Sequence, residues 1–152
     1  MPAAVEDEKI EKLLEAGRWA PSGLNNQPWR FAIVRDKKVI KKISALTHYA
    51  KIVLSAPLLI PVFLDTANSY HREKDIQAVG ACLQNVLLEA HSLDLGAVWL
   101  GEIIRNSEPL KQILDLNNSS LELMAVVALG YPAETPKAAK RKALTDLVVY
   151  RN

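Results

Sequence analysis

The sequence contains only one cysteine, Cys82, so an intrachain disulfide framework is excluded and a reducing compartment is indicated. It also lacks an apolar run near the ~18 residues that a membrane helix needs. The longest apolar stretches, Ala56–Leu64 and Leu123–Leu129, have the lengths of buried strands. The N-terminal segment Met1–Glu8 has neither a basic cluster nor a following apolar segment, so we expect no signal peptide. We therefore expect a cytoplasmic protein with no membrane contact.

Local signatures of several catalytic classes are absent as well. His48, His71 and His91 lie far apart and no H-E-x-x-H pattern occurs, which argues against a metal site. The chain has no G-x-G-x-x-G motif, no phosphate loop and no G-x-S-x-G elbow around Ser22. Cys82 stands among apolar helix residues and is expected to be an inert buried thiol. The net charge of +2 is too small to indicate a nucleic-acid partner.

Hydrophobic periodicity predicts alternating helices and strands in a single domain over residues 1–152. Leu121–Leu129 is nearly continuous apolar sequence, which is typical of a central strand. Pro61 cannot donate a ladder hydrogen bond, so we expect an edge strand or a bulge there. The expected helices are Val5–Trp19, Lys37–Leu46, Asp75–Leu93 and Asn106–Leu116, and the expected strands are Arg30–Val34, Leu58–Leu64, Ala97–Leu100 and Leu121–Leu129, with a last extended segment over Leu144–Tyr150.

The segment Pro21–Trp29 carries a hydroxyl, two asparagines and a glutamine between two prolines. Its composition is that of a rigid polar turn between a helix and a strand. The same short amides and backbone N–H groups could also read the edge of a planar heterocycle, which offers alternating donors and acceptors. From the residues alone, both interpretations stay open.

Motif order and spacing add a second line of argument. The stretch Ala20–Phe31, followed by Ile33-Val34 and Asp36, resembles the A-P-S-x-x-N-x-Q-P-W-x-F signature of the nitroreductase family. Four further stretches agree in order and spacing with that family: Ser55–Pro57, Ala81–Ala90 with its Gln84-Asn85 pair, Leu95–Gly101 and Leu129–Pro132. The resemblance spans about Val5 to Val148.

This resemblance implies an α+β fold, with a nitroreductase-like mixed central sheet flanked by helices, in a homodimer that holds two FMN molecules between its subunits. Both subunits would contact each FMN. In the first loop, Pro21, Ser22, Gly23 and Asn25 would lie against the flavin ring, and Gln27 would support the ring or the ribityl chain. Leu100 and Gly101 would offer backbone groups from the opposite side, and Arg141 and Lys142 would bind the phosphate. A guanidinium fork suits a phosphate dianion, although a solvated basic linker explains Lys137–Lys142 equally well.

The activity implied is that of an FMN-dependent oxidoreductase. The flavin carries the chemistry, taking hydride from NAD(P)H and then reducing a nitroaromatic, quinone or similar conjugated acceptor by a ping-pong mechanism. No catalytic side chain is required. Two alternatives are a non-catalytic flavin-binding or regulatory protein of the same fold, and an interaction domain without a ligand. The sequence indicates neither the physiological acceptor nor a preference between NADH and NADPH.

Two further features bear on the cofactor and on assembly. Family members carry an R-R-S-x-R-like stretch before the first helix, whereas here Val5–Glu8 already matches the segment on the C-terminal side of that stretch. Either the native protein starts earlier, or FMN is held by fewer cations and we expect weak or partial occupancy. Small residues at Ala78, Gly80 and Ala81, together with the apolar tail Leu147–Tyr150, fit a dimer interface but equally fit an intrachain core.

Overall fold

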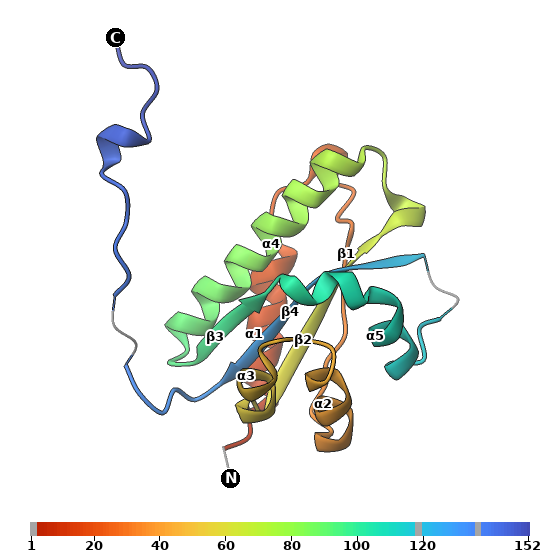
Figure 1. Ribbon diagram of the computed structural model, residues 1–152. Helices are drawn as coiled ribbons and strands as arrows, with labels where there is room; N and C mark the ends of the chain where they lie inside the picture. The colour runs from red at the N-terminus through yellow and green to blue at the C-terminus, as the bar shows by residue number, and fades with distance from the viewer. Residues whose placement is uncertain (1–2, 118–119, 136–137) are drawn as a thin grey trace.

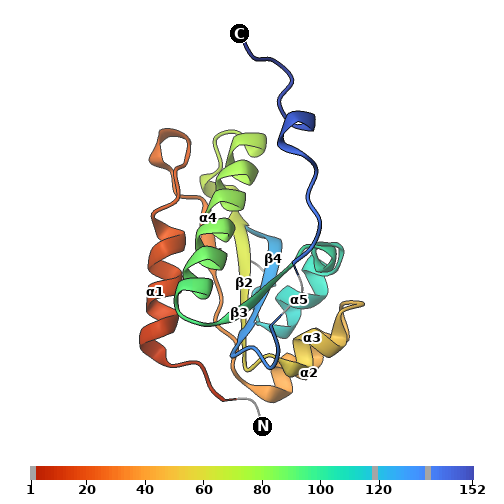
Figure 2. The same ribbon diagram turned by 90° about the vertical axis from the view of Figure 1, so that its left-hand side faces the viewer.

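The computed structural model describes residues 3–117, 120–135 and 138–152, and its centre is a four-stranded antiparallel sheet (Figure 1). In spatial order the strands are β1 (Trp29–Phe31), β2 (Leu58–Asp65), β4 (Leu121–Gly130) and β3 (Gly96–Leu100). One face is covered by α1 (Asp7–Arg18) and α4 (Arg72–Ser92), and the other by α2 (Lys37–Ser44), α3 (Ala50–Ser55) and α5 (Ser107–Ile113) (Figure 2). The α+β class implied by the resemblance is confirmed.

Both faces of the sheet are buried, which explains the apolar runs of its inner strands. Ile60 and Leu64 of β2 pack toward α1 and α4, whereas Leu59 and Phe63 pack toward the other helix layer. Successive side chains of a strand point to opposite faces, so a strand between two helix layers needs apolar residues at every position. The eight residues of β2 are accordingly all buried.

The expectation that Pro61 marks an edge strand is wrong, because β2 lies between β1 and β4. The carbonyl of Pro61 accepts a hydrogen bond from Ala32 N (3.0 Å), just beyond the last β1–β2 pair, Phe31 with Val62. In an antiparallel strand the nitrogen and the carbonyl of one residue point to the same side, so the Pro61 nitrogen also faces β1. The missing N–H therefore leaves the ladder to β4 intact. The sheet does contain an irregularity one step further on, opposite Val62 and Phe63, where Met124 is an extra residue in β4.

Helix α4 begins three residues before the expected start at Asp75. The apolar spacing of this segment places Ile76, Val79 and Leu83 on one stripe; Val79 and Leu83 are buried, but Ile76 is 38% exposed. The helix lies very close to α1: a Cβ built on Gly17 would lie 3.1 Å from the Sγ of Cys82. Gly17 lies in the last turn of α1, so this close contact lies directly before the loop that follows the helix.

Beyond Tyr131 the chain leaves the body as an extended arm (Figures 1 and 2). Tyr131 itself is anchored, since its hydroxyl donates to the carboxylate of Glu6 and the Lys9 ammonium lies 4.8 Å from its ring centroid. The described arm residues are exposed, Val149 completely. Residues 144–146 form one turn of 3-10 helix, so the predicted last extended segment is interrupted there.

The basic stretch Lys137–Lys142 falls partly outside the described residues, because it includes residue 137. The sequence Asn117-Asn118-Ser119-Ser120, whose composition predicts a turn, likewise includes residues 118 and 119, which lie outside them. Over the ranges that the structure describes, no helix is both long enough and apolar enough to cross a bilayer.

Candidate functional site

The amide-rich loop between α1 and β1 adopts an unusual backbone. Leu24, Asn25 and Gln27 have φ values of 53°, 55° and 47°, in the left-handed region that non-glycine residues rarely occupy. Each such residue costs of order 1–3 kcal/mol and persists only where its surroundings impose it, most often at ligand-binding sites. The polar turn expected from composition is therefore present, and its geometry is more constrained than a simple connection requires.

Hydrogen bonds within the loop maintain this conformation. The Ser22 hydroxyl oxygen accepts from the Gln27 backbone N–H at 3.0 Å, and the Gln27 side-chain amide donates to the Asn25 carbonyl at 3.1 Å. Two further backbone bonds, from Asn25 N to Ser22 O and from Asn26 N to Gly23 O, form a 3-10 turn over Gly23–Asn25. Ser22 and Gln27 thus hold the loop closed, and the Ser22 O–H remains free to donate.

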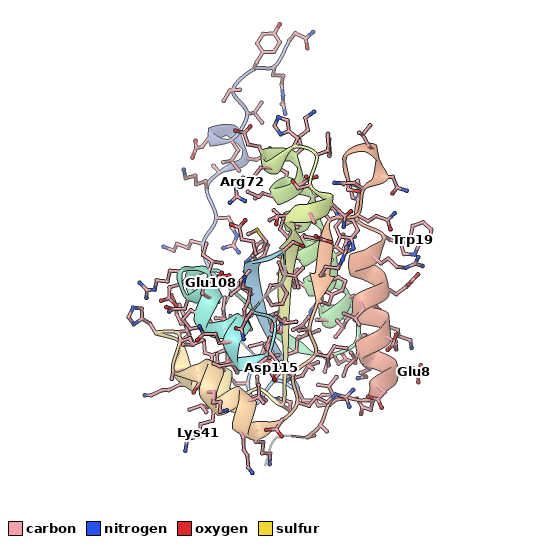
Figure 3. The ribbon with its side chains drawn as sticks, turned by 90° about the vertical axis from the view of Figure 1, so that its right-hand side faces the viewer. Glu8, Trp19, Lys41, Arg72, Glu108 and Asp115 are labelled. Atoms are coloured by element: carbon pink, nitrogen blue, oxygen red, sulfur yellow. The ribbon has the colours of Figure 1, made fainter. Side chains whose placement is uncertain are left out.

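The Asn25 side chain, by contrast, is exposed and has no hydrogen-bond partner among the described residues. Together with Pro21 and Gln27 it lines a surface groove of about 370 Å³, which Arg18, Trp19 and Ala20 complete. Trp19 projects outward at the end of α1 (Figure 3) and is 73% exposed. A free amide beside an apolar wall can bind a flat group through both its edge and its face.

A buried carboxylate beneath the loop was not identified as a site residue from the sequence, which marked Asp75 only as a helix start. Asp75 is fully buried and accepts hydrogen bonds from Asn26 Nδ2 (2.8 Å), Ser69 Oγ (2.6 Å) and the backbone N–H groups of Tyr70 and His71 (3.1 and 3.3 Å). Burial raises the pKa of Asp75, but these donors outweigh it and bring the pKa below its ordinary value. The carboxylate therefore stays ionised near neutral pH.

Tyr70 is the second contact that sequence reasoning missed. A Cβ built on Gly23 would lie 1.8 Å from the Tyr70 hydroxyl oxygen, so the phenol end lies directly on this glycine. The Lys74 ammonium lies 5.6 Å from the Tyr70 ring centroid. Only the absence of a side chain at Gly23 permits this approach.

The predicted residues Leu100 and Gly101 lie at the end of β3, on the opposite edge of the sheet from the loop. Leu100 is buried, whereas its neighbour Trp99 is 41% exposed. The carboxylate of Glu102 accepts from the Thr47 hydroxyl at 2.8 Å and forms an ion pair with Arg105. The Thr47 hydrogen bond lowers the pKa of Glu102, against a smaller opposing effect of burial.

Arg141 and Lys142 are exposed and belong to the extended C-terminal arm that Figure 1 shows. Among the described residues, the Arg141 guanidinium donates to the neighbouring Lys140 carbonyl, at 3.3 Å, and to no other group, which leaves it available to an anion. Within one chain, the structure thus unites residues 21–27 in one loop and does not bring Leu100, Gly101, Arg141 or Lys142 to it.

The part of the chain that the structure describes contains no cluster of three or more His, Cys, Asp or Glu side chains suited to a metal ion. Cys82 is buried, as expected, and burial raises the pKa of its thiol to about 12.

The body is an α+β fold in which an antiparallel sheet lies between two helix layers, and the strained amide loop leads into its edge strand β1. Comparison with known proteins identifies this α+β class more closely: the family model described as "Nitroreductase family" matches residues 1–50 and 44–131. The chain belongs to the nitroreductase family, and the resemblance of the Ala20–Phe31 motif is confirmed at the level of the family.

Three relatives illustrate the similarity. A protein of Archaeoglobus fulgidus assigned as an NADH dehydrogenase/NAD(P)H nitroreductase is 36% identical over 133 residues, covering 86% of this chain and 76% of its own. An FMN reductase [NAD(P)H] of Bacillus subtilis is 27% identical, over 95% of this chain and 64% of its own. A protein of Desulfovibrio desulfuricans, assigned as a nitroreductase and solved with FMN, superposes with a TM-score of 0.93 at 45% identity, covering 100% of this chain and 88% of its own.

Proposed function

We propose that this chain is an FMN-dependent oxidoreductase that uses NAD(P)H to reduce nitroaromatic, quinone or similar conjugated acceptors, and that it works as a cytoplasmic homodimer. The observation that carries the proposal is the loop over residues 21–27, whose strained backbone leaves the Asn25 amide free beside a groove. The family membership and the FMN-bound relative support flavin as the group that this loop receives.

The donor set suits FMN. Asn25 offers both a donor and an acceptor to the edge of a flat ring, the Ser22 O–H is free to donate, and Pro21 provides an apolar face. Gly23 and Gln27 belong to the same loop, and Gln27 supports it through its bond to Asn25 O. Arg141 and Lys142 supply unpaired positive charge for a phosphate dianion.

FMN, when bound, supplies the two-electron chemistry, accepting hydride from NAD(P)H and passing it to the second substrate. The protein's part is to bind and orient. The loop would hold one side of the ring, backbone groups of Leu100 and Gly101 would contact its other side, and Arg141 and Lys142 of the arm would bind the phosphate. No side chain of this chain needs to act as an acid or a base, which agrees with the lack of a catalytic dyad in the sequence.

A homodimer would allow one flavin to touch both the loop of one copy and Gly101 of the other. The strands that carry them, β1 and β3, are separated by two strands, roughly 15 Å at ~4.8 Å per strand, and the sheet fills that space. A second copy can bring its own β3 edge to the loop of the first, in a self-complementary contact. The exposed apolar groups of the arm, Leu147 and Val149 among them, and of α4, Ile76 and Leu88, are surfaces that such a contact would cover.

Titration of the purified protein with FMN, followed by quenching of flavin fluorescence, tests the cofactor. Oxidation of NADH and NADPH by the FMN-loaded protein, with a nitroaromatic or a quinone added, then tests the activity. Turnover that depends on the acceptor supports the proposal. Flavin binding without turnover would instead favour a binding or regulatory protein, and failure to bind FMN would favour an interaction domain.

A further inference from the structure

We propose that Asp75 is a positioning residue of the cofactor site, which holds the loop 21–27 in its receptive conformation through Asn26. This inference rests on the proposed function, since it names the group that prepares the FMN loop. Neither the motif nor the relatives' names point to it. The loop and the start of α4 lie side by side at one end of the molecule (Figure 2).

The first step is the orientation of Asn26. Its amide nitrogen donates to the Asp75 carboxylate at 2.8 Å and toward the Asn68 carbonyl at 3.4 Å. Its Oδ1 atom is buried and has no donor among the described residues. If residue 75 carried a hydrogen-bond donor, the Asn26 amide group could rotate by 180° so that its Oδ1 atom accepted from that donor. An ionised carboxylate can only accept hydrogen bonds, so the Nδ2 atom of Asn26 must face Asp75. Asp75 therefore dictates the position of Asn26 at the expense of one unmade hydrogen bond.

The second step is the position of Asn26 within the loop. It is flanked by Asn25 and Gln27, both with positive φ, and its own backbone N–H closes the 3-10 turn on Gly23. Holding the Asn26 side chain in place therefore restrains the backbone of the two residues with positive φ on either side of it, Asn25 and Gln27. Asn25, whose amide has no partner among the described residues, lines the groove together with Pro21 and Gln27.

The third step is the Tyr70 contact. The same carboxylate accepts from the Tyr70 backbone N–H at 3.1 Å and from Ser69 Oγ at 2.6 Å. It thereby fixes the segment that places the Tyr70 phenol on Gly23. Asp75 joins both sides of this contact, so the loop and its covering tyrosine are set by one buried charge. A loop preformed in this way binds its ligand with less loss of conformational entropy.

The test compares FMN affinity in wild type, Asp75→Asn, Asn26→Ala and the double variant, together with the melting temperature of each apo protein. Asp75→Asn keeps the size of the side chain but replaces one acceptor with a donor. We expect the FMN dissociation constant to rise about tenfold in each single variant and no further in the double variant, because the two residues act as one unit. We also expect the visible spectrum of bound FMN to change in Asp75→Asn at saturation.

Asp36→Ala is the control for lost stability alone. The Asp36 carboxylate caps α2, where it accepts from the backbone N–H groups of Lys38 and Val39, both of which lie outside the loop 21–27. The variant should lose thermal stability while its FMN affinity and flavin spectrum stay those of wild type.

Unchanged FMN affinity in Asp75→Asn, with a lowered melting temperature, would overturn the positioning role and leave Asp75 a structural group. Additive losses in the double variant would likewise contradict action through Asn26. Wild-type protein that fails to bind FMN at all would instead overturn the proposed function, so the two failures are distinguishable.

Discussion

The Ser22 hydroxyl oxygen accepts a hydrogen bond from the Gln27 backbone N–H at 3.0 Å, which closes the loop that carries the family's most specific motif. The bond spans five positions and encloses two of the three left-handed residues, Leu24 and Asn25. Serine therefore has a structural duty here, and its remaining O–H is the part available to a ligand. A residue of this motif can thus contribute both to the shape of the loop and to ligand binding. Measuring FMN affinity and thermal stability in single variants distinguishes the two contributions.

Replacing Asn25 with glycine removes the free amide while keeping a residue that tolerates a φ of 55°. We expect FMN affinity to fall about two- to twelvefold, the equivalent of one lost hydrogen bond of about 0.5–1.5 kcal/mol, with little loss of thermal stability. Leu24→Gly is the control, because Leu24 is 85% exposed and has nearly the same φ. Equal FMN affinities in the two variants would exclude Asn25 from the flavin contact.

Removing the guanidinium in Arg141→Ala should weaken FMN by about 10- to 150-fold, as expected for a charge-assisted hydrogen bond worth about 1.5–3 kcal/mol. Riboflavin, which lacks the phosphate, should bind wild type and variant alike. Arg151→Ala, in the same exposed arm, serves as the control for nonspecific charge. A parallel loss of riboflavin binding would show that Arg141 acts on something other than the phosphate.

Substitution of Gly80 tests whether a second copy packs against the outer face of α4. A Cβ built on it meets no atom within 4 Å in the single chain, so Gly80→Ala should stabilise an isolated subunit by about 0.5–1 kcal/mol. Where a second copy approaches this face closely, the added methyl should instead raise the dimer dissociation constant, measured by analytical ultracentrifugation. Lys38→Ala on α2 controls for helix propensity alone. Unchanged association of Gly80→Ala would place the dimer contact elsewhere.

The stability of the chain should fall in acid because of its buried carboxylates. Burial raises the pKa of Asp65, but its bonds from Asn68 and Ser120 and its ion pair with Arg30 outweigh that and bring the pKa below the ordinary 3.8. A carboxyl with a lowered folded-state pKa stabilises the native state above its unfolded pKa, and this contribution is lost as the pH falls through the folded value. Urea unfolding at pH 7, 5 and 3.5 should therefore show a loss below about pH 5 that is smaller in Asp65→Asn. An identical pH profile in the variant would contradict this assignment.

The Cys82 thiol should be inert in the native state. Its pKa of about 12 leaves about one thiolate in ten thousand at pH 8, and the sulfur is buried against Gly17. Reaction with a disulfide reagent should therefore proceed at the rate of unfolding and should be immediate in urea. Rapid labelling of the folded protein would show that the α1–α4 contact opens readily.

Several elements could be predicted because their causes are local. Leu121–Leu129 is apolar at nearly every position, which only a strand covered on both faces explains, and the helix over Asp7–Arg18 follows from its apolar spacing. The short helix Ala50–Ser55 was not predicted, because its six residues form less than two helical turns and offer too little periodicity. The exposure of Ile76 was also missed, since a helical stripe shows which residues share a face but not which side of the helix the body covers.

The sequence by itself determined the order of the longer helices and of the strands, and the loop motif that identifies the family, because apolar spacing, proline and short amides act over a few residues. Only the tertiary structure decided that Pro61 belongs to an inner strand, that Asp75 lies beneath a loop some 49 positions earlier in the chain, and that Gly101 lies at the opposite edge of the sheet from that loop. Such relations depend on which strands become neighbours and how closely α1 meets α4. These relations follow from the packing of the whole core, which cannot be inferred from a short stretch of sequence.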